Sequence, residues 1–131
     1  MLPATTITAA LLGLIYLALS YRVSQVRLSD KVSMGDGGNE TLIARMRAHA
    51  NFAEYVPLIL ILMALIELAR GAGAGFWLWL AGAAIVIGRL LHAWGMALPA
   101  PNKPRIGGTL LTWTTLALLS LWAFVLAATT L

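Results

Sequence analysis

Four long, largely apolar segments constrain this chain more than any other feature of its sequence. They cover about residues 2–21, 40–69, 76–97 and 107–128, and each is long enough to cross the ~30 Å hydrocarbon core of a bilayer as a helix. Only 11% of the 131 residues are charged, whereas about a quarter are charged in a typical soluble domain. The sequence therefore predicts an all-α membrane protein, an up-down bundle of four transmembrane helices that forms one domain over residues 1–131.

The basic residues gather at one end of this predicted bundle. Those near the connections between the first two and the last two helices are Arg22, Arg27, Lys31, Arg45, Arg47, Lys103 and Arg105, and Arg70 alone lies at the other end. Basic loops stay on the cytoplasmic side of a membrane. We therefore expect both termini outside, both basic loops in the cytoplasm, and a bacterial inner membrane as the location. No positive charge precedes the first apolar segment, so we expect a retained helix rather than a secretory signal.

The chain contains no cysteine, which excludes catalysis by a protein thiolate and any cysteine-based metal site. Any thiol chemistry must then come from a substrate, and we expect no metal. The formal charge of +4 indicates orientation in a membrane, and we expect no nucleic-acid partner.

A row of polar residues follows one face of the second predicted helix. At 100° per residue, Arg47, Asn51, Glu54 and Tyr55 share a sector about 100° wide, while His49 points nearly opposite to Arg47. An ionised group that faces lipid costs about 2.5–3.5 kcal/mol at mid-helix. The row should therefore face another helix or a wet cavity. Its spacing fits equally well a ligand that carries carboxylates and an ammonium, or polar contacts that hold helices together.

Two polar residues lie within the third predicted helix. Arg89 requires a partner in this apolar stretch, and we expect it to pair with Glu54 or to hold a ligand. His92 follows one turn later and is interpreted more readily as a hydrogen-bonded structural residue than as a ligand-binding one.

The segment Arg47-x-x-x-Asn51-x-x-Glu54-Tyr55-x-Pro57 resembles the signature of the MAPEG family. These are the membrane-associated proteins of eicosanoid and glutathione metabolism, which include microsomal glutathione transferases and leukotriene C4 synthase. The residue types, their spacing, their position early in the second helix and the four-span layout all match, so the resemblance covers essentially the whole chain.

This resemblance implies a homotrimer that binds glutathione, as co-substrate, between neighbouring subunits near the cytoplasmic face. Small residues such as Gly82, Ala83 and Ala84 would permit close helix contact. By resemblance, Arg47 would contact a glutathione carboxylate, Asn51 a polar backbone group and Glu54 the ammonium, with Tyr55 alongside.

The resemblance also implies roles for residues outside the second helix. Arg27 lies where family members carry a basic residue that closes the first span, although an ordinary membrane anchor fits equally well. Arg105 follows a proline-asparagine run similar to one in microsomal transferases, and it is the candidate activator of the thiol, with Lys103 as the competitor. Family members often carry tyrosines where this chain has His92 and Met96, which weakens the transfer of any tyrosine-based role. The candidate binding residues are Arg27, Arg47, Asn51, Glu54, Tyr55, Arg89 and His92.

We therefore expect a glutathione transferase or peroxidase that acts on lipophilic small molecules from the membrane lipid. An arginine near a helix N-terminus can favour the thiolate of glutathione over the thiol. The alternative is a non-enzymatic membrane oligomer, or a binder of another anionic metabolite. A small multidrug transporter is disfavoured because the segment 2–20 lacks the acidic residue that such exporters carry in their first span.

Overall fold

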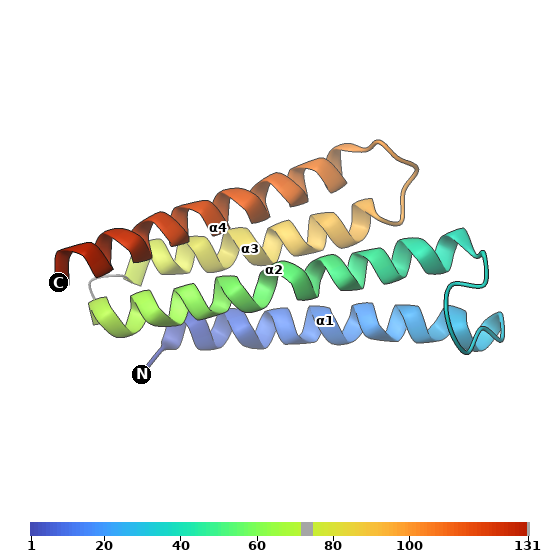
Figure 1. Cartoon of the computed structure of the whole chain (residues 1–131), viewed down its shortest axis with the longest axis horizontal. Helices are drawn as coiled ribbons and strands as arrows, with labels where there is room; N and C mark the ends of the chain where they lie inside the picture. The colour runs from blue at the N-terminus through green and yellow to red at the C-terminus, as the bar shows by residue number, and fades with distance from the viewer. Residues whose placement is uncertain (72–74, 131) are drawn as a thin grey trace.

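The computed structural model describes residues 1–71 and 75–130. Within these residues the chain forms four α-helices, namely α1 (Pro3–Ser29), α2 (Glu40–Arg70), α3 (Gly75–Gly95) and α4 (Lys103–Thr130). The helices run side by side and alternate in direction (Figure 1). Each of the four is long and apolar enough to cross a membrane. The predicted all-α fold with four membrane-spanning segments is confirmed.

Both chain termini lie at one end of the bundle, and the α1–α2 and α3–α4 connections lie at the other (Figure 1). We call the latter the basic end, because most of the lysines and arginines are near it. The predicted helix bounds leave a short turn between the second and third helices, and its residues 72–74 lie outside the described part of the chain.

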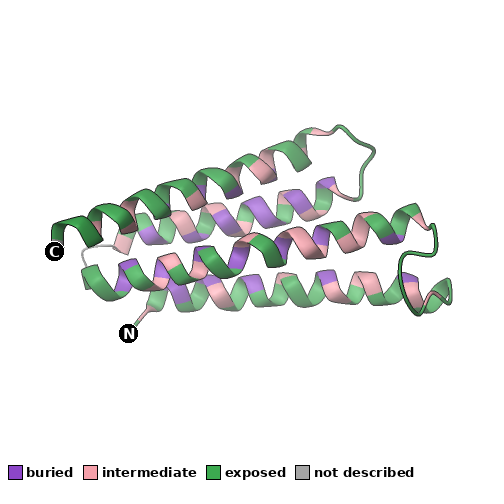
Figure 2. Ribbon diagram, viewed as in Figure 1, coloured by how far each residue is buried: buried purple, intermediate pink, exposed green. Residues whose placement is uncertain are grey.

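Every helix carries large apolar side chains on the outer surface of the bundle. Leu14, Leu65, Leu90 and Phe124, one from each helix, are all more than half exposed. Figure 2 shows exposed residues along the full length of each helix and buried residues interspersed among them. Large apolar side chains in contact with water would be unfavourable, whereas hydrocarbon accommodates them at no cost.

The core is held together by close helix contacts at small residues. Helix α1 packs against α2 and α3, and α4 packs against α3 and α2. A Cβ atom on Gly108 would lie only 2.5 Å from the backbone oxygen of Gly88, and one on Gly82 would collide with the Thr8 hydroxyl. Gly82, which we expected to permit close contact, makes that contact within the subunit, against α1.

The helix boundaries differ from those predicted, most of all at the end of α1 and the start of α4. Helix α1 continues to Ser29 instead of ending near residue 21, because residues 21–29 contain no glycine or proline and i→i−4 hydrogen bonds do not require lipid. Helix α3 ends at Gly95, two residues before the predicted end.

Helix α4 begins at Lys103 instead of residue 107. The Asn102 side-chain oxygen accepts a hydrogen bond from the Arg105 backbone N–H at 2.9 Å, which caps the helix. Pro104 lies in the first turn of α4, where a missing N–H removes no helical hydrogen bond.

Glu67, near the end of α2, caps the first helix. Its two carboxylate oxygens accept hydrogen bonds from the backbone N–H groups of Ala4 and Thr5, both at 2.9 Å. Helix α1 has no side-chain cap of its own, and Pro3 has no N–H to satisfy. A carboxylate at a helix N-terminus is favourable because it satisfies unpaired donors and opposes the helix dipole.

Candidate functional site

The predicted polar row of α2 lies along one side of the bundle, and its members differ in burial. Arg47 and Glu54 are exposed, whereas Asn51 and Tyr55 are half-buried. Among the described residues, no hydrogen bond or ion pair engages the side chain of Arg47 or of Glu54. These two charged groups are therefore available to a molecule outside the subunit.

Asn51 is held from inside the bundle by Arg89. The Arg89 side chain is 2% exposed, and its Nη1 donates to the Asn51 side-chain oxygen at 2.8 Å. Its Nη2 donates to the Thr112 hydroxyl at 2.6 Å and lies 3.5 Å from the backbone oxygen of Gly108. A guanidinium group only donates, so the Asn51 oxygen faces Arg89 and the Asn51 amide nitrogen is left to bind an acceptor.

Of the two alternatives expected for Arg89, pairing with Glu54 is wrong within this subunit, and binding of a ligand stays a prediction. Glu54 lies on the outer side of the polar row and is exposed, whereas Asn51 lies closer to the core side of α2. The rotation of α2 therefore presents the amide of Asn51 to α3 and turns the carboxylate of Glu54 away.

Arg89 carries a buried charge whose hydrogen-bond partners are all neutral. Its Nε atom is buried and has no partner within the described residues. A buried charge usually lies beside an opposite charge. The network of Asn51, Arg89 and Thr112 consequently leaves a positive field behind the polar row, which favours an anion bound nearby.

His92 lies one turn after Arg89 and is 6% exposed. Its ring makes no hydrogen bond to the described part of the chain, so the expected hydrogen-bonded role is not found. Its backbone nitrogen lies against Gly108, where a Cβ atom would come within 2.5 Å. Tyr55, a member of the polar row, packs against the apolar core, and Met96 does so just after the end of α3.

Arg105 is the third residue of α4 and is exposed. Its backbone lies so close to Gly95 that a Cβ atom on Gly95 would collide with it. Arg47 and Arg105 both lie one turn from a partner of Arg89. Asn51 follows Arg47 by one turn of α2, and Gly108 follows Arg105 by one turn of α4. Helices α2 and α4 pack together and both start at the basic end, so Arg47 and Arg105 both lie between this network and the basic end of the bundle. Lys103 is also exposed, at the first turn of α4.

Arg27, in the last turn of α1, lies against a different face of α2 from the one that carries the polar row. Its Nη1 donates to the Val32 backbone oxygen at 3.3 Å, and its Nη2 lies 3.5 Å from the Met46 sulfur. His49, which also faces α1, stacks on Tyr16 and lies 3.0 Å from the Ser20 hydroxyl, so its predicted direction opposite to Arg47 is confirmed. Arg27 therefore stabilises the α1–α2 connection and does not meet Arg47 within one subunit.

Reasoning from the sequence missed Thr112 and Gly108, and it did not assign a capping role to Asn102. Thr112 is a buried polar residue in an apolar helix, and its position one turn after a glycine was the available signal. Asn102 is identifiable as a cap because it precedes a proline in the first turn of a helix.

Comparison with known proteins adds a family and a relative. A sequence model of the MAPEG family matches residues 5–125. The chain is also similar to the protein described as "Inner membrane protein YecN" in Escherichia coli K12 and in Escherichia coli O6:H1. In both cases 34% of residues are identical over 88 residues, which cover 66% of this chain. The chain spans 65% of the length of these curated relatives.

Proposed function

This chain belongs to the MAPEG family, and from that premise we propose that it binds glutathione along the polar row of α2 and transfers it to lipophilic electrophiles. The supporting observation is that the unpaired side chains of Arg47 and Glu54 flank Asn51, whose amide is oriented by the buried Arg89. Glutathione carries two carboxylates and one ammonium. A cation, an anion and a fixed amide donor on one face of a helix complement these groups.

The chemical step requires the thiolate, which is the nucleophilic form of a thiol. A free thiol has a pKa of about 8.5, and lowering it by two units requires about 2.7 kcal/mol of preference for the anion. We assign this role to Arg105, because its guanidinium is unpaired among the described residues and its position in the first turn of α4 adds the helix dipole. The thiol proton leaves to water. The thiolate then forms a carbon–sulfur bond, and the leaving group departs with its electron pair.

The electrophile would arrive from the bilayer, where apolar molecules concentrate. The apolar outer surface of the bundle supports this route. Because the relatives are described as inner membrane proteins, we also assign this chain to an inner membrane, with its basic end in the cytoplasm.

We extend the proposal to a homotrimer. Arg47 and Glu54 lie on the outside of the subunit, and a charge that faces lipid costs about 2.5–3.5 kcal/mol at mid-helix. A neighbouring subunit that covers this face would enclose the ligand and keep the charges from the acyl chains. Native mass spectrometry from nanodiscs tests the assembly, and a monomer as the main species would overturn it.

Isothermal titration of the detergent-solubilised protein with glutathione tests the proposed site. We expect saturable binding at millimolar concentration or below, and at least tenfold weaker binding by Arg47→Gln and by Glu54→Gln. Arg70→Gln is the matched control, because Arg70 is an exposed arginine at the opposite end of the same helix. Absence of binding at millimolar glutathione would end the proposal.

The network of Asn51, Arg89 and Thr112 also favours the second candidate, a non-enzymatic membrane oligomer, because it ties α2, α3 and α4 together. The ultraviolet absorbance of the thiolate separates the two functions. Bound glutathione that is ionised near neutral pH supports the transferase. Bound glutathione that stays a thiol, or a pocket that prefers another anionic metabolite, supports the second candidate.

A further inference from the structure

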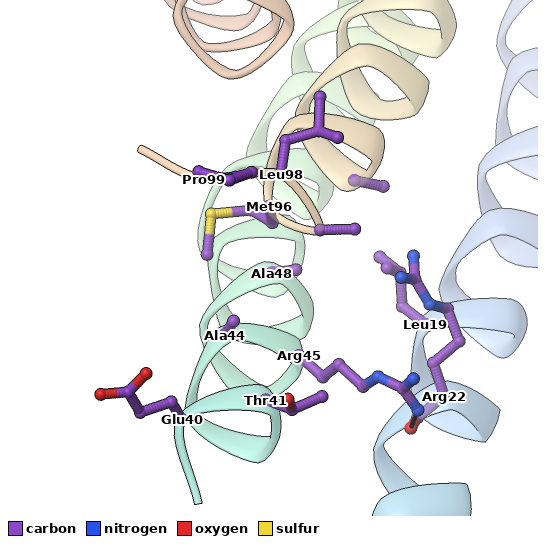
Figure 3. A pocket seen from close by; sticks show the side chains of 12 residues that line it. Leu19, Arg22, Glu40, Thr41, Ala44, Arg45, Ala48, Met96, Leu98 and Pro99 are labelled. Atoms are coloured by element: carbon purple, nitrogen blue, oxygen red, sulfur yellow. Dashed lines mark hydrogen bonds between the residues drawn. The ribbon is translucent and has the colours of Figure 1, made fainter. Parts of the chain in front are cut away.

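A separate polar cavity opens at the basic end of the bundle. It has a volume of about 420 Å³ and lies between α1, the first turns of α2 and the end of α3. Arg22 and Arg45 contribute its positive charges (Figure 3). Its walls are otherwise mostly apolar and include Leu19, Ala48 and Met96. None of the residues of the polar row lines it, since Arg45 and Arg47 project from nearly opposite sides of α2.

Neither arginine of this cavity forms an ion pair with a described residue. Arg45 Nη1 donates to the backbone oxygen of Arg22 at 2.7 Å, which fixes its guanidinium against α1. Among the described residues, no hydrogen bond or ion pair engages the Arg22 guanidinium. Glu40 also borders the cavity, but Figure 3 shows its carboxylate on the far side of the first turn of α2, away from both guanidinium groups. Two guanidinium groups without an ion-pair partner in the described chain therefore face the same cavity.

The depth of the cavity matches the lipid headgroups. Arg22 lies about 28 Å along α1 from Pro3, at 1.5 Å per residue. This distance is close to the ~30 Å thickness of the hydrocarbon core. Since Pro3 is at the end of the bundle that holds the termini, Arg22 lies near the opposite boundary, where the phosphate groups of lipids lie. The apolar wall formed by Leu19 and Met96 faces the same space and can contact the glycerol and upper acyl segments of a lipid.

We propose that this cavity binds the phosphate of an anionic phospholipid, with Arg22 and Arg45 contacting the phosphate oxygens. Guanidinium groups suit a phosphate because they donate several hydrogen bonds in one plane. Two cations that form no ion pair with the carboxylate of Glu40 repel the ammonium of a zwitterionic headgroup, so the site selects lipids of net negative charge. This proposal does not depend on glutathione binding, which involves another face of α2.

Native mass spectrometry tests the proposal on the intact protein released from micelles that contain either phosphatidylglycerol or phosphatidylcholine. We expect at least tenfold tighter binding of phosphatidylglycerol, and loss of that preference in Arg22→Gln. This substitution preserves the bond from Arg45 to the α1 backbone, so folding should be unaffected, and far-ultraviolet circular dichroism checks it. Arg70→Gln, a neutralised arginine at the opposite end of the bundle, should keep the preference. Equal retention of the two lipids, or an unchanged preference in folded Arg22→Gln, would overturn the proposal.

A second arm separates a lipid from free phosphate. Inorganic phosphate at millimolar concentration should not displace phosphatidylglycerol, because it lacks the apolar segment that contacts Leu19 and Met96. Displacement by inorganic phosphate would overturn the assignment to a lipid. Glutathione titrations of Arg22→Gln should match those of the unmodified protein, so the lipid site and the glutathione site can fail separately.

Discussion

Glu67 and Arg89 are both buried charged residues, but their surroundings differ. Glu67 lies toward the end that holds the termini, and both of its carboxylate oxygens accept hydrogen bonds from the first turn of α1. Arg89 lies in the half nearer the basic end, bonds only to neutral groups, and has a buried Nε without a partner in the described chain. Asn51, the partner of Arg89, lies within one turn of the exposed and unpaired charges of Arg47 and Glu54, whereas the described residues of α2 within one turn of Glu67 include one exposed charge, that of Arg70.

The difference indicates that the charge of Glu67 stabilises the fold, whereas the charge of Arg89 orients a group on the binding surface. The Glu67 carboxylate is used fully by backbone donors that would otherwise be unpaired, so its effect should be on stability. Arg89 uses part of its donor capacity to orient one amide and leaves a positive field, so its effect should be on binding. Substitutions in the two regions should therefore change different measured quantities.

The largest expected effect is that of Glu67→Ala on stability. The substitution leaves the N–H groups of Ala4 and Thr5 buried and unpaired, and we expect a loss of about 3 kcal/mol in the free energy of unfolding. Titration with sodium dodecyl sulfate, followed by circular dichroism, measures it. Glu54→Ala, which removes an exposed carboxylate from the same helix, should change stability by about 0.5 kcal/mol or less. Similar losses of stability in the two variants would contradict the stabilising role assigned to Glu67.

The next effect is that of Arg105→Gln on the bound thiol. If Arg105 favours the thiolate by about 2.7 kcal/mol, its loss raises the thiol pKa by two units, from about 6.5 to about 8.5, and lowers the thiolate fraction at pH 7 by about 25-fold. Activity requires the anion, so it is lost as pH falls through the pKa of the bound thiol. The midpoint of the rate–pH profile should therefore move toward about 8.5 in the variant.

Lys103→Gln is the matched control for Arg105, because it neutralises a cation in the same turn of α4. Its rate–pH profile should coincide with that of the unmodified protein. A shift in Lys103→Gln and none in Arg105→Gln would move the thiol-activating role to Lys103.

A smaller effect is expected for Arg89→Met on glutathione affinity. Removing the guanidinium frees the Asn51 amide to rotate, and we expect about tenfold weaker binding, equivalent to about 1.4 kcal/mol. Stability should change little, because a buried charge replaced by an apolar side chain of similar volume is often neutral. Calorimetry and unfolding on the same preparation measure both quantities. Unfolding at much lower denaturant with unchanged glutathione affinity would make Arg89 a structural residue like Glu67.

The smallest effect is that of Asn102→Ala, which removes a neutral helix cap at the basic end. We expect a loss of about 1 kcal/mol in the free energy of unfolding, the usual contribution of an N-cap. Thermal unfolding in micelles, compared with Glu67→Ala, measures whether a charged cap inside the bundle contributes more than a neutral one at its edge. Equal losses would show that charge and burial add nothing to the α1 cap.

The direction of side chains on α2 was predictable, whereas their partners were not. The helical wheel places Arg47 and His49 on opposite sides, and His49 indeed stacks on Tyr16 of α1. The wheel does not tell which residue Arg89 meets, because that depends on how far α2 is rotated toward α3. The binding roles of the row, of Arg27 and of Arg105 stay predictions.

The amino-acid sequence alone determined that the chain forms membrane-spanning helices, their number and their order, because the thickness of hydrocarbon sets how long an apolar helix must be. It also placed the polar row on one face of α2, since the helical repeat is independent of the surroundings. Only the tertiary structure decided that Arg89 binds Asn51, that Glu67 caps α1 and that Arg22 and Arg45 share a cavity. These contacts join residues distant along the chain, and they depend on the rotation and separation of helices that glycines such as Gly88 and Gly108 allow to approach.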